Sequence, residues 1–174
     1  GEPRFAQDFE RAVERGLRTH AWFFDHEPEP ARIMDRLHAY GYFLEALLAV
    51  SDRPEARLAL RDGIQRAAKH LRAVRGGFER SDVNAQLLRV RLWADAQGAV
   101  KLDEVQAAEE AGWAAAYQME SDDPRLDGGF NFGRRHGAMT NFANPVSTDF
   151  CLQALALWDD YQHGVPLADR RTLI

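Results

Sequence analysis

The residues best suited to chemistry gather in the stretch 127–149, DGGFNFGRRHGAMTNFANPVSTD. It begins with Asp127 and ends with Asp149, and two carboxylates about 5–10 Å apart are the acid and base that a glycosidase needs. Asp82, at the start of a predicted helix, would serve with either of them. For Asp82 and Asp149 a second interpretation stays open, because aspartate is also a common helix-capping residue.

A basic triplet, Arg134-Arg135-His136, lies inside this stretch. Arginine binds planar anions through two parallel hydrogen bonds, so Arg134 and Arg135 would hold a carboxylate, a phosphate or a sulfated sugar. We group His136 with the aspartates as a candidate catalytic residue. The alternative is that the triplet is a set of surface charges, or that it forms ion pairs with the aspartates of 122–127.

Aromatic and amide side chains accompany the charged ones. Phe130, Asn141 and Asn144 are predicted to bind a ligand, since aromatic rings stack on sugars while amides hydrogen-bond to hydroxyl groups. The loop 120–146 is 27 residues long, and loops of this length in compact domains are commonly functional or disordered. It would otherwise be a plug that closes one end of a helical layer.

An apolar helix upstream adds His38 and Tyr40 to the predicted ligand-binding residues. His38 shares a helix face with Tyr42 and Glu45, so that a proton-transfer pair of His38 and Glu45 is conceivable. A histidine hydrogen-bonded within the core is the alternative.

Several classes of function receive no support. The histidines show no metal-ligand spacing such as HEXXH, and Cys151 is the only cysteine, so neither a metal site nor a disulfide is expected. Nucleotide-binding glycine motifs are absent and no cofactor is predicted. A net charge of −5 gives no electrostatic reason to expect nucleic acid or an anionic membrane. The compartment stays open, with the cytoplasm slightly favoured.

Helices must position these residues. Apolar residues recur every three to four positions in six segments, which predicts six helices and no strand. The second, fourth and sixth segments are more apolar than the others. The predicted helices span 4–24, 31–50, 54–74, 81–98 and 102–119, with a sixth that begins at Ser147 or Thr148.

The three more apolar helices resemble one another in sequence. Residues 42–50 align without gaps on 150–158, and 85–93 follows the same frame. Repeated pairs of one surface helix and one buried helix are typical of stacked helical hairpins. We therefore predict an all-α fold of three hairpins, with the even-numbered helices forming an inner layer.

This pattern resembles an (α/α) toroid, the fold of six-hairpin glycosidases and of terpenoid cyclases. In addition, Asp127-Gly-Gly-Phe130 followed by Phe132-Gly133 resembles the turn that begins repeats in the squalene-cyclase and prenyltransferase superfamily. The resemblance implies about half of a toroid. Ser121-Asp122-Asp123-Pro124 lacks the DXDD pattern of class II cyclases, so no protonating role is assigned to it.

We expect a single domain, 1–174, of a longer protein, since the sequence begins Gly-Glu-Pro without methionine. The amino ends of the inner helices and the loop 120–146 would form one end, where a polar small molecule or a glycan binds. The protein would then be a glycan-processing enzyme or part of one. The alternative is a non-catalytic helical-repeat domain, whose partner would be the remaining half of the toroid or a second copy.

Overall fold

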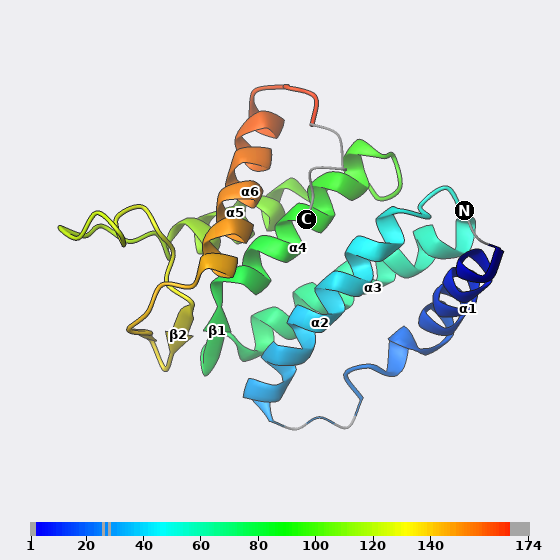
Figure 1. The fold of residues 1–174 in the computed structure, drawn as a ribbon, viewed down its shortest axis with the longest axis horizontal. Helices are drawn as coiled ribbons and strands as arrows, with labels where there is room; N and C mark the ends of the chain where they lie inside the picture. The colour runs from blue at the N-terminus through cyan, green and yellow to red at the C-terminus, as the bar shows by residue number, and fades with distance from the viewer. Residues whose placement is uncertain (1–2, 26, 28, 168–174) are drawn as a thin grey trace.

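The structure, a computed structural model, describes residues 3–25, 27 and 29–167. It is mostly helical, which confirms the predicted all-α class (Figure 1). Within the described part of the chain, no helix is long and apolar enough to cross a membrane. The helices are α1 (Pro3–Thr19), the 3₁₀ turn η1 (His20–Trp22), α2 (Pro30–Leu48), α3 (Pro54–Val74), α4 (Ser81–Ala96), α5 (Glu104–Ala115) and α6 (Pro145–Gln162).

Local sequence sets most of the helix starts. Proline occupies the first turn of α2, α3 and α6, where its missing N–H costs nothing. Asp103 caps α5 by accepting a hydrogen bond from the backbone N–H of Gln106. The predicted caps of α6, Ser147 or Thr148, are wrong, because the Asn144 side chain accepts from the first free N–H groups.

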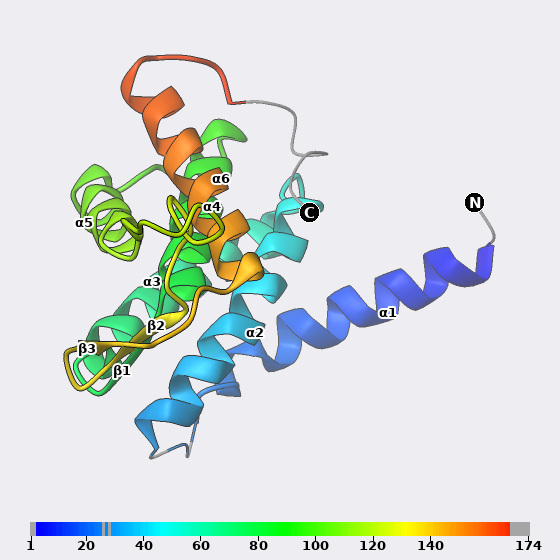
Figure 2. The ribbon, with the colours of Figure 1, turned by 60° about the vertical axis from the view of Figure 1, so that its left-hand side comes forward.

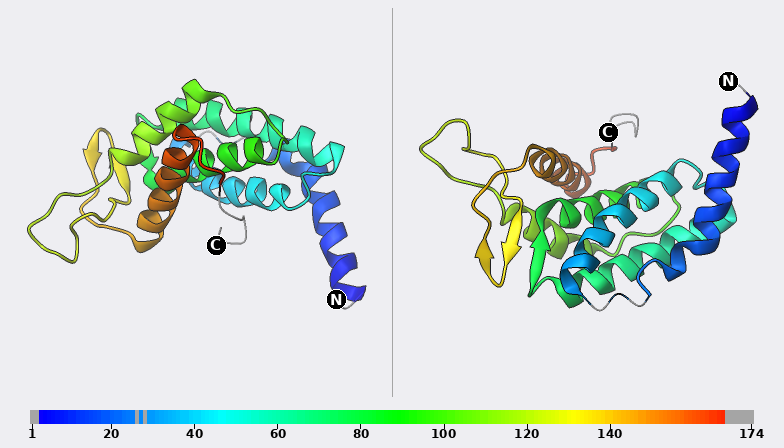
Figure 3. Two further views of the ribbon diagram at one scale, coloured as in Figure 1. Left: turned by 90° about the horizontal axis from the view of Figure 1, so that it is seen from above. Right: turned by 60° about the horizontal axis from the view of Figure 1, so that its bottom comes forward.

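The helices lie in two layers around α4. Helix α4 packs against α2 on one side and α6 on the other, while α3 lies along α2 and α4, and α5 along α4 and α6 (Figures 1 and 3). The even-numbered helices therefore neighbour one another in order, as the repeat predicted. The closure of such layers into a toroid stays a prediction.

Helix α4 is buried along its length from Ser81 to Ala94, including its charged side chains. Arg91 is satisfied by Glu110 of α5, whose carboxylate accepts from Nε at 2.7 Å and from Nη2 at 3.1 Å. Arg72 of α3 donates to the same carboxylate at 3.3 Å. This buried ion pair connects the outer helices to the centre of the molecule.

Helix α1 leaves the body of the molecule at its amino-terminal half (Figure 2). Val13 and Leu17 pack against the core, whereas Phe5 and Phe9 of the same apolar stripe are exposed. The Arg53 guanidinium donates two hydrogen bonds, of 2.7 and 2.8 Å, to the Glu10 carboxylate and so ties α1 to the turn before α3.

A small antiparallel sheet contradicts the prediction that the chain has no strand. It consists of β1 (Phe78–Arg80), β2 (Gly133–Arg135) and β3 (Ala138–Met139) in the order β1-β2-β3. A Cβ at Gly133 would lie 2.2 Å from the backbone oxygen of Glu79, so only glycine permits this pairing. Figure 3 shows the sheet and the loop that precedes it at the opposite end from α1. The predicted loop 120–146 is thus partly a hairpin that joins the start of α4.

We predict that Glu110→Ala lowers the free energy of unfolding by about 3–5 kcal/mol, because it leaves the buried Arg91 without its counter-ion. The neighbouring Glu109 is half exposed and, among the described residues, pairs only with Arg72, so Glu109→Ala is the control, with a loss of about 1 kcal/mol or less. Urea denaturation of both variants gives the comparison. Equal losses would show that the burial of Glu110 does not decide its contribution.

Candidate functional site

A polar surface crosses the inner layer where α2, α4 and α6 meet. Helix α2 contributes Tyr42 and Glu45, helix α4 contributes Gln86 and Arg89, and the start of α6 contributes acidic, aromatic and amide side chains. We call this surface the Arg89 face; its residues are Tyr42, Glu45, Gln86, Arg89, Asp149, Phe150 and Gln153.

Arg89 is the central residue of this face and is only 2% exposed. Its guanidinium lies over the Phe150 ring at 4.5 Å, and its Nη2 is 3.5 Å from Oε1 of Glu45. Its Nε and Nη1 are buried without a hydrogen-bond partner among the described residues, as are Oε1 of Glu45 and Oε1 of Gln153. A buried polar atom without a partner costs free energy, so the face is incomplete as it stands.

Burial dominates the electrostatics of the Arg89 face. It raises the pKa of Glu45, an effect that the Arg89 charge opposes. It lowers the pKa of Arg89, while the negative charges of Glu45 and Asp149 oppose that change. Arginine stays protonated at any physiological pH. The face thus holds a fixed positive charge and a carboxyl group that is easier to protonate than usual.

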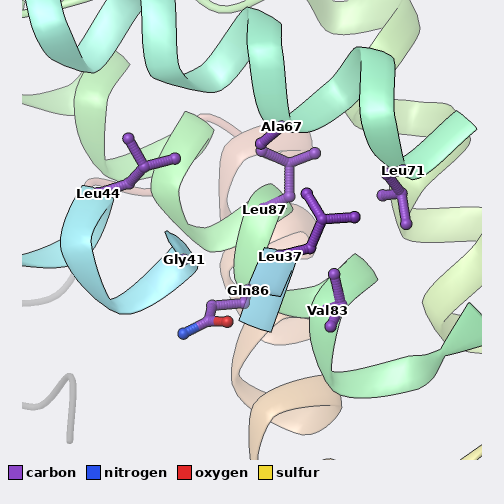
Figure 4. A pocket seen from close by; sticks show the side chains of 8 residues that line it. All are labelled: Leu37, Gly41, Leu44, Ala67, Leu71, Val83, Gln86 and Leu87. Atoms are coloured by element: carbon purple, nitrogen blue, oxygen red, sulfur yellow. The ribbon is translucent and has the colours of Figure 1, made fainter. Parts of the chain in front are cut away.

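Gln86 positions Tyr42 by reaching into α2. In the amide orientation that satisfies both of its polar atoms, Gln86 donates to the His38 carbonyl at 3.1 Å and accepts from the Tyr42 N–H at 3.2 Å. A regular α-helix joins those two backbone groups to each other. The approach depends on Gly41, since a Cβ there would lie 2.3 Å from the nearest atom of the Gln86 amide group (Figure 4).

The same contact borders a small cavity between α2, α3 and α4. Its volume is about 10 Å³, roughly the space of one water molecule, and apolar side chains form most of its wall (Figure 4). It is too small to hold a substrate. The lining residues are Leu37, Gly41, Leu44, Ala67, Leu71, Val83, Gln86 and Leu87.

The structure brings two predicted site residues together where the middle of α2 faces the amino end of α4. Nδ1 of His38 is 3.8 Å from Oδ2 of Asp82, and burial lowers the pKa of His38 while the Asp82 charge opposes this. The Arg80 guanidinium donates to both oxygens of Asp82, at 3.0 and 2.8 Å, and also pairs with Asp35. Asp82 is fully buried and makes no capping bond to its own helix, so its expected role as a cap is wrong.

Asp127 and Asp149 also come together, in an open groove of about 630 Å³ between the loop and α6. Both side chains are exposed; Asp127 accepts from the Ser121 N–H at 3.1 Å and Asp149 from the Gln153 amide at 3.0 Å. Across the described residues, no three His, Cys, Asp or Glu side chains are grouped so as to hold a metal ion. Asp149 borders both this groove and the Arg89 face.

The basic triplet lies elsewhere, on the small sheet. Arg134 lies over the Tyr117 ring at 5.6 Å and Arg135 over the Phe78 ring at 4.5 Å. His136 is exposed at the tip of the β2–β3 hairpin with a positive φ of 47°. These residues and the aspartates of the groove occupy different local environments.

Of the four remaining predicted ligand-binding residues, three contribute to the packing or the capping of the fold. Tyr40 is buried on the side of α2 that faces η1, where its hydroxyl is 2.8 Å from Nδ1 of His20. Phe130 is fully buried and Asn144 caps α6. Asn141 is exposed next to the hairpin.

The sequence analysis did not identify Arg89 and Gln153. A signal for Arg89 exists, because it stands between Leu88 and Val90 in a helix that is apolar on both sides. A charged residue in such a context is either buried or functional. Gln153 gives no comparable signal, since an amide near the start of a helix is common.

No known relative adds to this geometry: no family model, curated protein or solved structure matches the chain.

We predict that Gly41→Ala destabilises the protein by about 1–3 kcal/mol, because the new methyl group collides with the Gln86 amide. Gly112 of α5 is the matched control, since a Cβ there would meet open space. Gly112→Ala is expected to stabilise the protein by about 0.5–1 kcal/mol, the usual gain on replacing a helical glycine. Thermal denaturation of the two variants measures both effects, and a gain in stability from both would contradict the contact.

Proposed function

We propose that the Arg89 face binds a polyhydroxylated, carbohydrate-like ligand. The observation that carries the proposal is the set of buried polar atoms without partners around Arg89, two of them donors on the guanidinium and two of them acceptors on Glu45 and Gln153. Sugar hydroxyl groups both donate and accept hydrogen bonds. Because these atoms lie beneath the surface, a ligand satisfies both kinds of atom only when exposed side chains such as Tyr42 and Asp149 turn aside to admit its hydroxyls.

The charges on the face support a neutral ligand over an anionic one. Arg89 is the one cation of the face, and the carboxylates of Glu45 and Asp149 both act on it. The three groups together carry a net charge of −1 when both acids are ionised. Tyr42, which is 48% exposed and lies edge-on to Phe150 at 6.1 Å, offers an aromatic ring for a sugar to stack on.

The enzymatic form of the proposal assigns the two carboxylates different roles. Glu45, whose pKa burial raises, is the candidate general acid. Asp149 is exposed at the edge of the face and is the candidate base or nucleophile of a glycan-processing reaction. This retains Asp149 as a candidate catalytic residue and moves the proposed site from the end of the helices onto their inner face.

We predict that Tyr42→Ser weakens binding of the sugar by about tenfold, the usual contribution of one stacked ring. Phe142→Ser is the matched control, because Phe142 is 52% exposed and lies outside the face. Titration calorimetry against a panel of mono- and oligosaccharides provides the measurement. Absence of binding to the whole panel by the unaltered protein, or equal losses in the two variants, would overturn the proposal.

The Asp127→Asn variant tests whether the ligand binds at the Arg89 face or in the groove between the loop and α6. If the ligand lies on the Arg89 face, this substitution in the groove leaves the affinity unchanged. If the ligand lies at the loop, the affinity falls and the proposed face is wrong. Hydrolysis products in the same mixtures would show that the protein is an enzyme and not only a binding domain. The Glu45→Gln variant, which lacks the proposed general acid, should form no such products.

A second candidate function, an interaction domain, is favoured by the exposed apolar residues at the amino-terminal end. On α1, Phe5 is 67% exposed and Phe9 is 46% exposed. Exposed apolar side chains that follow one helix stripe are typical of contacts with another protein. The second copy of this chain is the simplest such partner.

If α1 mediates self-association, the Phe5→Ser/Phe9→Ser variant should be monomeric at concentrations where the unaltered protein forms dimers. Leu58→Ser removes one apolar side chain of similar exposure from α3 and serves as the control. Sedimentation velocity resolves the two species. A monomeric unaltered protein would exclude this form of the second candidate.

A further inference from the structure

A polar groove of about 360 Å³ on α3 has no role in the ligand site proposed above. Its residues lie on successive turns of one helix face and include two permanent cations and a histidine. The groove is formed by Asp62, Gln65, Arg66, Lys69 and His70.

The two cations of this groove have no counter-ion among the described residues. In the part of the chain that the structure describes, neither Arg66 nor Lys69 has an acidic side chain within 4.0 Å, and Nε of Arg66 is buried without a hydrogen-bond partner. The one acidic residue in the groove, Asp62, is 3.5 Å from the guanidinium of Arg61 instead. The groove is therefore locally positive in a chain of net charge −5.

The positive charge of the groove affects the pKa values of two histidines. Burial lowers the pKa of His70, and the charges of Arg66 and Lys69 lower it further while Asp25 opposes them. Burial and the Arg66 charge also lower the pKa of His20, while the charge of Asp62 opposes this effect.

Neighbouring aromatic side chains hold both imidazoles in place. The His70 ring stacks on Phe24 at 4.4 Å, and Nδ1 of His20 is 2.8 Å from the Tyr40 hydroxyl. An imidazole fixed in this way donates to a ligand without losing further side-chain freedom.

We propose that this groove binds a phosphate group. Arg66 lines the groove with a guanidinium that has no ion pair among the described residues, Lys69 adds a point charge and His70 adds a ring nitrogen one turn after Arg66. Arginine and lysine bind phosphate by these complementary modes. The phosphate would belong either to a small metabolite or to a lipid head group, since the same contacts serve both.

Histidine NMR on the full chain tests the proposal with inorganic phosphate as the probe. A bound phosphate dianion stabilises the imidazolium form, so the pKa of His70 should rise, and that of His20 should follow to a smaller extent. The exposed His163, just after the carboxyl end of α6, is the internal reference. Sodium chloride of equal ionic strength controls for screening. No shift at His70, or equal shifts at His70 and His163, would overturn the proposal.

Charge-removal variants locate the bound phosphate. Arg66→Gln and Lys69→Gln should each weaken binding by about tenfold, which corresponds to the loss of one charge-assisted hydrogen bond. Lys101→Gln removes the same charge from an exposed position outside the groove and should change the affinity less than twofold. Equal losses in all three variants would mean that phosphate responds to the overall charge, and the proposed site would be wrong.

Vesicles that contain phosphatidic acid separate the two sources of phosphate. Binding of free phosphate to the groove indicates a soluble ligand, whereas binding only to vesicles, lost in Arg66→Gln, indicates a lipid head group. Binding of neither overturns the proposal. The sugar experiments use a different face of the molecule, so either proposal can fail without the other.

Discussion

Helix α4 passes through the middle of the domain, and its polar side chains cannot reach water, so each one needs a partner on a neighbouring element. Arg91 finds Glu110 on α5, and Asn84 donates to Glu79 of β1 at 2.8 Å. Gln86 reaches the backbone of α2. A buried charge without a partner destabilises a fold by several kcal/mol, on the order of 3–5 for a broken buried pair. The arrangement of the other helices is therefore linked to the positions of these few residues.

The two buried arginines of α4 illustrate the consequence. Arg89 and Arg91 are two positions apart, which turns their side chains about 200° from each other on the helix and toward opposite layers. Toward α5, Arg91 donates to Glu110 at 2.7 and 3.1 Å and to Gln106 at 2.7 Å. Toward α2 and α6, Arg89 has one ion pair at 3.5 Å and two unpartnered nitrogens. The buried arginine on the outer side of α4 thus has hydrogen-bond partners, whereas the one on the inner side lacks them for two of its nitrogens. This difference is why the ligand is proposed on the inner side.

Periodicity and repeat alignment predicted much of the fold, because helices with a strong apolar stripe are specified locally. The predicted span of the third helix, 54–74, is the observed one. The alignment of 42–50 with 150–158 also pairs Tyr42 with Phe150 and Glu45 with Gln153. These four side chains lie on the two helices that flank Arg89. The repeat therefore relates the side chains of α2 and α6 that border Arg89 to each other.

The strands and the surroundings of Asp82 were not predictable in the same way. Each strand has two or three residues, too few for an alternating pattern, and β1 pairs with a segment that is distant in sequence. Asp82 has the local sequence of a helix cap, and only the folded chain places Arg80 and His38 against it. Both failures involve contacts between segments that local propensity does not encode.

The two proposed ligand sites differ in one respect, the presence of carboxylates beside an arginine. Arg89 has Glu45 and Asp149 within electrostatic reach, so an anion would meet two like charges there, whereas a neutral polyol would not. Arg66 has Lys69 beside it and pairs with no carboxylate in the described part of the chain, so an anion reduces the repulsion between the two cations. Both arginines have an unpartnered nitrogen, which by itself indicates only that something is missing. The neighbouring charges decide which chemistry would complete each site.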